Sequence, residues 1–321
     1  MLEDGTSSGI PAIDEVIQRL ELQPVLFLGA GFSRRYFGGL NWVELLRQIS
    51  AKAVIETPLD YFVQKHSGNL PLVASDLVEP VFEWAWRAGK NSFSKELFQA
   101  DVPRDTFLKS LACDTIRESM EAAKIKMPST LRKELDLLAQ VFPQAVITTN
   151  YDTGLDQVFK GYKPIVGQEI YRYKLTEIGE VYKIHGSVDR PQSLILTSED
   201  YQDYDRKRKY LAAKLLAMFA ENPVIIAGYS LTDPNVTKLI CDIGEITASD
   251  DGRIENIIYV DWRPPGEDQN APDTLTLASG ERTFYVRRVV VSDFLSTFQS
   301  SARQQRLPAS GHRSYEPSRP E

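Results

Sequence analysis

The chain has 321 residues, of which 42% are hydrophobic and 25% charged, and its net charge at pH 7 is −7. This composition is typical of a soluble globular protein with one large domain, and the acidic balance argues against direct binding to nucleic-acid phosphates. The N-terminal residues lack the basic and apolar regions of a signal peptide, and no apolar run reaches the length of a membrane span. We therefore expect a cytoplasmic protein with no membrane contact.

The first predicted strand is followed by a glycine-rich turn. Residues 10–22 show helical spacing, and the apolar run Val25–Leu28 leads directly into Gly29-Ala-Gly-Phe-Ser33. A buried strand that ends in Gly-x-Gly lets the backbone approach a phosphate group at the N-terminus of the next helix. Because Arg34 replaces the third glycine of the dinucleotide-binding pattern, a plain tight turn explains these residues equally well. The side chains of Arg34 and Arg35 are either phosphate ligands or exposed to solvent.

The region that follows is predicted to be helical. Asn41 and Glu44 have the spacing of a capping box, which indicates a helix that continues to about Thr57. Apolar residues at helical spacing then recur as far as Phe142, in segments separated by prolines. We expect a helical insertion over about residues 58–142, between the first strand and the second, and we interpret its aromatic residues as core.

The second half of the chain alternates strands with helices. Apolar runs predict strands at residues 145–148, 163–166, 170–173, 181–184, 194–196, 223–227 and 257–260, with an edge strand or hairpin at 283–291. Thr197 caps a long predicted helix that ends near Glu221, and Asp233 with Pro234 starts another. This alternation predicts an α/β fold: a Rossmann-like parallel sheet with helices on both faces and an inserted helical subdomain. After this domain of residues 1–299, residues 300–321 are predicted to be a disordered tail or a linker.

Four of the predicted strands end in polar or glycine-rich segments. These segments are Gly29–Ser33, Asn150–Asp152, His185–Ser187 and Gly228–Asn235. Because the carboxyl ends of parallel strands meet at one edge of a sheet, a shared pocket is the economical explanation. Each feature also has a plainer interpretation: Asn150 and Asp152 could cap a turn, His185 could be a core histidine, and Ser230 and Asp233 could only cap a helix.

Taken in this order, the four motifs resemble those of the sirtuin (SIR2) superfamily. They are Gly-Ala-Gly-Phe-Ser33, Thr149-Asn150-Tyr-Asp152, Lys-Ile-His185-Gly and Gly-Tyr-Ser230-Leu-Thr-Asp233-Pro-Asn235. The resemblance spans about residues 25–262 and is closest to the SIR2-like domains of bacterial antiphage defence proteins. It implies NAD⁺ as the substrate in the cleft, with chemistry at the bond between nicotinamide and ribose.

The chain departs from protein-deacylating sirtuins in its cysteines. Those enzymes carry a four-cysteine zinc ribbon, whereas this sequence has only the two separate residues Cys113 and Cys241. The departure puts the peptide platform of a deacylase in doubt. We therefore expect no metal, and we expect the chain to be more similar to the zinc-free NAD⁺ hydrolases.

The resemblance, together with the chemistry of each side chain, implies roles for the motifs. Asn150 would hold a water molecule beneath the anomeric carbon, His185 would accept a proton, and Asp152 would bind nicotinamide or support Asn150. The remaining candidates would bind the nucleotide: Gly29, Ala30, Gly31, Ser33 and Thr149 on one side, Gly228, Ser230, Asp233 and Asn235 on the other, and Asp261 at the adenosine ribose.

The expected function is therefore an NAD⁺ glycohydrolase that releases nicotinamide and ADP-ribose, or a cyclised product, as the effector of an antiphage defence system. The alternatives are an NAD⁺-dependent protein deacylase and a non-catalytic module that senses a nucleotide during assembly. Because uncontrolled NAD⁺ loss is toxic, we expect control by homo-oligomerisation, or by a partner ATPase or a fused sensor domain that responds to a phage trigger.

Overall fold

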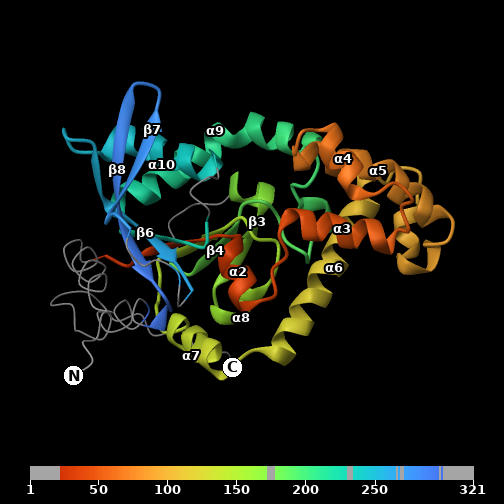
Figure 1. The fold of residues 1–321 in the computed structure, drawn as a ribbon, viewed down its shortest axis with the longest axis horizontal. Helices are drawn as coiled ribbons and strands as arrows, with labels where there is room; N and C mark the ends of the chain where they lie inside the picture. Colours follow the sequence, from red (N-terminus) through yellow and green to blue (C-terminus); the bar gives the residue numbers. More distant parts are fainter. Residues whose placement is uncertain are drawn as a thin grey trace.

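The computed structural model describes residues 22–171, 178–229, 234–264, 267, 271–295 and 298. Within these ranges eight strands form one sheet, in the order β3-β4-β2-β1-β5-β6-β8-β7 (Figure 1). The strands are β1 (Val25–Leu28), β2 (Ala145–Thr148), β3 (Lys163–Val166), β4 (Glu180–Lys183), β5 (Val224–Ala227), β6 (Arg253–Trp262), β7 (Thr274–Ser279) and β8 (Arg282–Val291). Neighbouring strands are parallel except β7 and β8, which pair antiparallel at one edge. The predicted α/β fold with a Rossmann-like sheet is confirmed.

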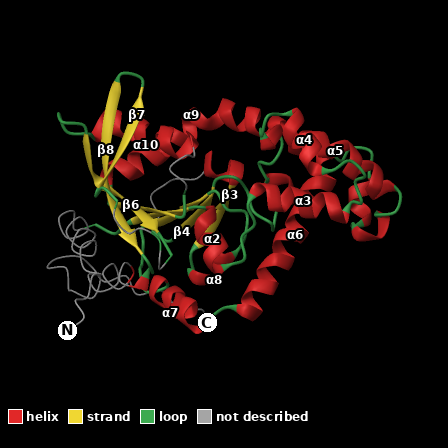
Figure 2. Ribbon diagram, viewed as in Figure 1, coloured by secondary structure: helices red, strands yellow, loops and turns green. Residues whose placement is uncertain are grey.

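Helices cover both faces of this sheet, as Figure 2 shows. On one face, α9 (Ser198–Glu221) and α10 (Pro234–Thr247) pack on strand residues such as Phe27 and Ile147. On the other face, α2 (Ala30–Tyr36), α7 (Ser129–Leu138) and α8 (Gly154–Val158) pack on the alternate residues of the same strands, such as Leu26 and Val146. Successive side chains of a strand point to opposite faces, so the central strands must be apolar throughout.

The helical insertion has a hydrophobic core of its own. It contains α3 (Trp42–Lys52), α4 (Leu59–Lys65), α5 (Leu70–Trp86), η1 (Lys90–Ser92), η2 (Lys95–Phe98) and α6 (Asp105–Lys126). The core takes in α3, whereas α7 packs against the sheet, so the helical unit covers residues 42–126 and not the expected 58–142. Helical periodicity alone could not show this boundary, because it does not say which surface a helix covers.

The predicted capping box at Asn41 and the predicted cap at Thr197 are both present. The Asn41 side chain accepts a hydrogen bond from the Glu44 amide at 2.8 Å, and the Glu44 carboxylate accepts one from the Asn41 amide at 2.9 Å. Thr197 and Asp200 make the same reciprocal pair at the start of α9. Capping of this kind satisfies amide groups that have no partner inside the helix, which explains why each helix begins at that residue.

The predicted strand at residues 194–196 is wrong, because these residues have no regular structure. Of the strand predicted at 170–173, residues 170 and 171 belong to a 3₁₀ helix, η3 (Gly167–Tyr171), and residues 172–173 lie outside the described residues. The apolar residues Leu194 and Leu196 are buried in the core of the insertion, so their apolar character reflects packing and not strand pairing. The predicted helix at residues 10–22 and the tail at 300–321 lie outside the described residues. No helix in the described ranges is long and apolar enough to cross a membrane.

Candidate active site

The sheet order brings the four predicted motifs to one edge. Strands β4, β2, β1 and β5 are consecutive neighbours, and their carboxyl ends lead to His185, Asn150, Gly29 and Gly228 respectively. Between β1 and β5 the strand order reverses direction, and in open α/β sheets such a switch point is where ligands bind. The motifs therefore surround the position that the fold itself favours for a ligand.

The glycine turn after β1 packs directly on the turn after β5. The amide of Gly29 donates to the main-chain oxygen of Ala227 at 2.9 Å, and the amide of Gly31 donates to that of Gly228 at 2.7 Å. A Cβ atom at Gly29 would lie 2.6 Å from the main-chain oxygen of Gly228, which is too close for any side chain. The Gly-x-Gly pattern thus serves the contact between two turns, and only the exposed residues Ala30 and Gly31 form an open surface there.

Asn150 is held in a single orientation. It is 7% exposed, and its amide nitrogen Nδ2 donates to the main-chain oxygen of Gly29 at 2.8 Å and to Oγ of Ser33 at 2.6 Å. Because a main-chain oxygen can only accept, the group facing Gly29 must be the NH₂ group. Both amide hydrogens are therefore used. In the described structure the side-chain oxygen Oδ1 has no hydrogen-bond partner, and it is the atom left to accept a hydrogen from a ligand.

Ser33 connects Asn150 to Asp152. Its hydroxyl donates to Oδ2 of Asp152 at 2.5 Å, while Oδ1 of Asp152 accepts from the amide of Gly154 at 2.9 Å. All three side chains are buried. The hydroxyl hydrogen of Ser33 is thus bonded to Asp152, and Asp152 supports Asn150 through Ser33.

A tyrosine fixes the adjoining residues of the same strand end. The hydroxyl of Tyr229 lies 3.3 Å from the amide nitrogen of Thr149 and 3.2 Å from its Oγ1. The Tyr229 ring packs on Phe27 with ring centres 4.5 Å apart. One step earlier, the hydroxyl of Thr148 donates to the main-chain oxygen of Leu28 at 2.7 Å. These bonds hold the ends of β1, β2 and β5 together.

His185 follows β4 and lies against aromatic rings. Its partly accessible imidazole meets Tyr204 and Tyr201 edge-on, with ring centres 5.2 Å and 5.8 Å away, and has no hydrogen-bond partner in the described residues. Loss of hydration lowers the pKa of His185 from the usual 6.5 to about 4, because the apolar surroundings disfavour its charged form. The imidazole is therefore neutral at pH 7 and able to accept a proton.

Comparison with known families supports the sequence resemblance. Residues 144–279 match the family model of the SIR2-like domain, and this range includes Asn150, Asp152, His185 and Gly228. Over these residues the chain is similar to SIR2-like domains. The glycine turn after β1 and the helical insertion lie outside the matched range.

Several curated proteins are similar to this chain. "NAD(+) hydrolase ThsA" from Acinetobacter baumannii is 24% identical over 237 residues, which are 72% of this chain and 41% of that protein. "NAD(+) hydrolase ThsA" from Bacillus cereus is 25% identical over 136 residues, 41% of this chain and 29% of that protein. "Defense-associated sirtuin 2" from Bacillus subtilis is 26% identical over 111 residues, 33% of this chain and 11% of that protein. The chain thus spans less than half the length of each of these relatives.

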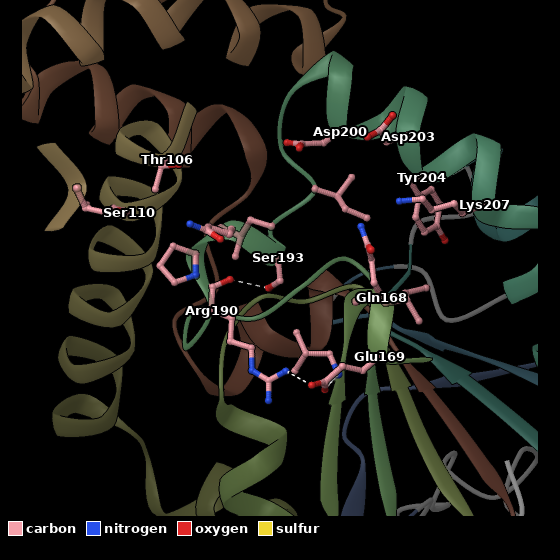
Figure 3. A pocket seen from close by; sticks show the side chains of 18 residues that line it. Thr106, Ser110, Gln168, Glu169, Arg190, Ser193, Asp200, Asp203, Tyr204 and Lys207 are labelled. Carbon is pink, nitrogen blue, oxygen red and sulfur yellow. Dashed lines mark hydrogen bonds and ion pairs between the residues drawn. The ribbon is translucent and has the colours of Figure 1, made fainter. Parts of the chain in front are cut away.

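A cavity of about 620 Å³ lies close to His185. Figure 3 shows Thr106 and Ser110 of α6 on one side of the cavity and Tyr204 of α9 on the other, and Tyr204 also contacts the His185 ring. Arg190 and Glu169 form an ion pair of 2.6 Å at its wall. The cavity thus separates the insertion from the β3–β4 end of the sheet, and Asn150 does not line it.

Of the remaining predicted ligand-binding residues, the structure describes the side chain of Asp261 but not those of Asn235, Ser230 and Asp233. The Asp261 carboxylate on β6 accepts hydrogen bonds from Arg263 at 3.2 Å and from Nε of Arg288 at 3.0 Å, so it is already paired with two cations. Asn235 lies in the first turn of α10, but the structure does not describe its side chain. Ser230 and Asp233 lie outside the described residues.

The two arginines after the glycine turn make ion pairs with protein carboxylates. Arg34 pairs with Glu44 at the surface, at 3.0 Å, and Arg35 forms a bidentate pair with the buried Glu134. In addition, no group of three His, Cys, Asp or Glu side chains among the described residues could hold a metal ion.

Sequence reasoning missed three residues of this site: Tyr204, Tyr229 and Lys183, whose ammonium donates to the main-chain oxygen of Asp152. Tyr229 directly follows Gly228, and Lys183 is a charged residue inside a run that otherwise reads as a buried strand, so both offered a signal. Tyr204 offered none, because its position on α9 resembles any other polar position of an amphipathic helix.

Proposed function

We propose that this SIR2-like domain hydrolyses NAD⁺ at the bond between nicotinamide and ribose, releasing nicotinamide and ADP-ribose or a cyclised product. The observation that carries the proposal is the Asn150 carboxamide, whose two hydrogens are bonded within the protein while Oδ1 stays free. This oxygen belongs to the motif at the switch point of the sheet, one strand from the neutral His185. The names of the similar NAD⁺ hydrolases support the same activity.

The proposed reaction divides its work between two side chains. A new bond forms between the water oxygen and the anomeric carbon, while the carbon–nitrogen bond breaks and nicotinamide leaves as a neutral molecule with the bonding electron pair. Asn150 Oδ1 accepts a hydrogen bond from the water and so orients its lone pair toward the carbon. The neutral imidazole of His185 takes up the proton that the water releases. For a cyclised product, an atom of the bound nucleotide would replace the water.

The nucleotide contacts are proposed along the same strand ends. The exposed backbone of Ala30 and Gly31 would face the phosphates, because it is the open part of the turn after β1. The turn after β5, with Gly228, Ser230, Asp233 and Asn235, would hold the other phosphate or ribose. Asp261 would reach the adenosine ribose only if the ligand shares that carboxylate with Arg288.

The decisive experiment is nicotinamide release measured for wild type, Asn150→Ala and His185→Ala with the same NAD⁺ supply. We expect Asn150→Ala to lower kcat by about 100-fold or more, since it removes the group that positions the nucleophile. Asn222→Ala is the matched control: Asn222 is equally buried and bonds the main-chain oxygen of Met218 at 2.8 Å, at the far end of α9. We expect this control to lose some stability and to keep its turnover.

Two outcomes would contradict the proposal. One is a wild-type protein that binds NAD⁺ tightly but releases no nicotinamide, alone or with its natural partner, which would indicate a nucleotide-sensing module. The other is an Asn150→Ala variant that folds and turns over like wild type.

We further propose that the activity serves antiphage defence in the cytoplasm, where NAD⁺ is available, and is switched on by self-association or by a partner ATPase or fused sensor domain that responds to phage. The support is the defence role named in one relative and the greater length of all three. Light scattering and NAD⁺ consumption measured on the same sample should rise together with concentration or with added partner. A permanently monomeric and fully active protein would contradict this mode of control.

A further inference from the structure

Lys183 is a buried cation next to the strand that delivers Asn150. It is the last residue of β4, it is 1% exposed, and it lies opposite Thr148 in the parallel pairing of β4 with β2. Its side chain points to the same face as Val181, toward α8, where the neighbouring buried side chains are apolar. An ammonium group in such a layer requires specific polar partners.

The partners of Lys183 belong to the turn that carries the Asn150 motif. Its ammonium donates to the main-chain oxygen of Asp152 and, at 2.9 Å, to Oδ2 of Asp156. Asp156 lies in the short helix α8, directly after this turn. Lys183 therefore connects three pieces of chain: the end of β4, the turn after β2 and the start of α8.

Stability alone does not explain a lysine here. Removing two charges from water costs free energy that their mutual attraction often fails to recover, and an apolar residue of similar size is frequently as stable or more so. The pair is also incompletely satisfied, because Oδ1 of Asp156 is buried without a hydrogen-bond partner. Lys183 differs from an apolar residue in that it donates a hydrogen bond to the main-chain carbonyl group of Asp152.

That carbonyl group belongs to the active-site turn, whose side chains make hydrogen bonds of their own. Asn150 donates to Ser33, Ser33 donates to Asp152, and the amide of Gly154 donates back to Asp152. These bonds fix the side chains of the turn, whereas Lys183 bonds the main chain of the turn at Asp152. Without the ammonium, the main-chain oxygen of Asp152 loses its hydrogen bond to the end of β4.

We infer that Lys183 is a positioning residue for the reaction: through the main chain of Asp152 it sets the place of Asn150 Oδ1. This inference rests on the proposed function. It predicts that loss of the ammonium lowers the rate of the chemical step while NAD⁺ still binds, because the atom affected orients the water and Lys183 makes no direct hydrogen bond to the turns after β1 and β5. A misplacement of about 1 Å is enough to cost about 100-fold in rate.

The test compares Lys183→Met with Val181→Ala. Methionine keeps the length of the side chain and loses its charge, and Val181 lies on the same strand and the same face but has no polar group to bond the turn. We expect Lys183→Met to lower kcat by about 10- to 100-fold with KM within about threefold of wild type. Val181→Ala should lower the unfolding temperature and keep kcat, and Lys183→Arg, which retains a charged donor, should recover part of the loss.

Amide hydrogen exchange gives a second readout that does not depend on turnover. The amide of Asn150 donates to Oγ1 of Thr148 at 3.0 Å, and the amide of Gly154 donates to Asp152. Both should exchange faster in Lys183→Met and at the wild-type rate in Val181→Ala.

Unchanged kcat and unchanged exchange in a folded Lys183→Met protein would overturn the inference. So would a loss of activity that matches Val181→Ala at equal loss of stability, or one that appears in KM alone. If wild type releases no nicotinamide, the proposed function fails, and the exchange comparison still decides whether Lys183 holds the turn.

Discussion

The hydroxyl of Ser33 lies at the centre of the active-site hydrogen bonds. It accepts from Asn150 and donates to Asp152, and the geometry leaves no hydrogen of either the hydroxyl or the amide unused. A buried polar network is worth most when every member is satisfied, and losing one member leaves the others unpaired in a medium of low polarity. The rigidity of Asn150 therefore depends on a residue that the sequence pattern had assigned to the nucleotide.

Substituting Ser33 with alanine should affect both stability and activity. One hydrogen of Asn150 and one oxygen of Asp152 lose their partner, which is expected to cost about 1–3 kcal/mol of unfolding free energy, together with a kcat at least tenfold lower. Chemical denaturation and nicotinamide release would measure the two effects. Ser50→Ala is the control, because Ser50 is also buried but bonds only the main-chain oxygen of Leu46 within α3. Equal effects of the two substitutions on kcat would contradict the assignment.

The lowered pKa of His185 predicts an unusual pH dependence. Because the imidazole is neutral above a pKa of about 4, the acid limb of kcat/KM should have its midpoint near pH 4 and not near 6.5. The same shift has a stability consequence: below pH 6.5 the unfolded chain binds a proton that the folded chain does not, so stability falls between pH 6.5 and 4. Kinetics from about pH 3 to 8, with circular dichroism at each point, would check this. A midpoint near 6.5 in the folded protein would contradict it.

At the scale of elements, α2 is fixed to α7 by a buried ion pair. Glu134 of α7, with a side chain 3% exposed, accepts two hydrogen bonds from Arg35 of α2 at 2.8 and 3.0 Å and one from the Tyr36 hydroxyl. Burial and the bond to Glu134 raise the pKa of Tyr36, which keeps the phenol protonated as a donor. Since α2 begins in the glycine turn, this ion pair also anchors the turn.

Removing the charge of Glu134 should therefore destabilise the protein strongly. Arg35 is largely buried, and Glu134→Gln removes the negative charge that balances its cation. We expect a loss of about 3 kcal/mol in unfolding free energy. Glu118→Gln makes the same chemical change in the exposed pair with Lys52, where the loss should stay below about 1 kcal/mol. Thermal unfolding of the two variants side by side would show the difference, and similar losses would mean that the buried pair contributes nothing specific.

At the scale of the whole molecule, the insertion and the active site share a segment of chain. Residues Val188, Leu194 and Leu196, which follow His185, are buried in the core of the insertion. Gly186 makes this possible, because its φ of +101° turns the chain and a Cβ there would lie 2.3 Å from the main-chain oxygen of Ser193. The helical insertion therefore packs on the loop that holds His185.

A cavity created in that shared core should destabilise both the helical insertion and the loop that holds His185. Leu196→Ala is expected to cost about 2–5 kcal/mol and to speed hydrogen exchange in α5, α6 and residues 186–196 together. Leu277→Ala is the control, because Leu277 is also buried but lies on β7, in the hairpin at the far edge of the sheet. If Leu196→Ala speeds exchange in the insertion helices alone, the two parts are not coupled through this segment.

The outline of the site could be predicted from the chain because it rests on local patterns. Short apolar runs followed by Gly29, Asn150, His185 and Gly228 are readable one strand at a time, and parallel strands bring their carboxyl ends to a common edge. The capping boxes at Asn41 and Thr197 were readable for the same reason, since all their atoms lie within four residues. The wrongly predicted strand at residues 194–196 shows where local patterns fail, because the apolar residues there are buried by the helical insertion.

By itself, the sequence determined the α/β order of elements, the four motifs and the resemblance to SIR2-like domains. Only the tertiary structure decided the role of each motif residue: Asn150 keeps its oxygen without a protein partner because Gly29 and Ser33, more than a hundred residues away, bind its nitrogen. Contacts between distant parts of the chain also place Ser33 between Asn150 and Asp152, and they bring the ammonium of Lys183 to the main-chain oxygen of Asp152. Hydrogen-bond direction depends on what lies within about 3 Å in space, and no local pattern of residues encodes that.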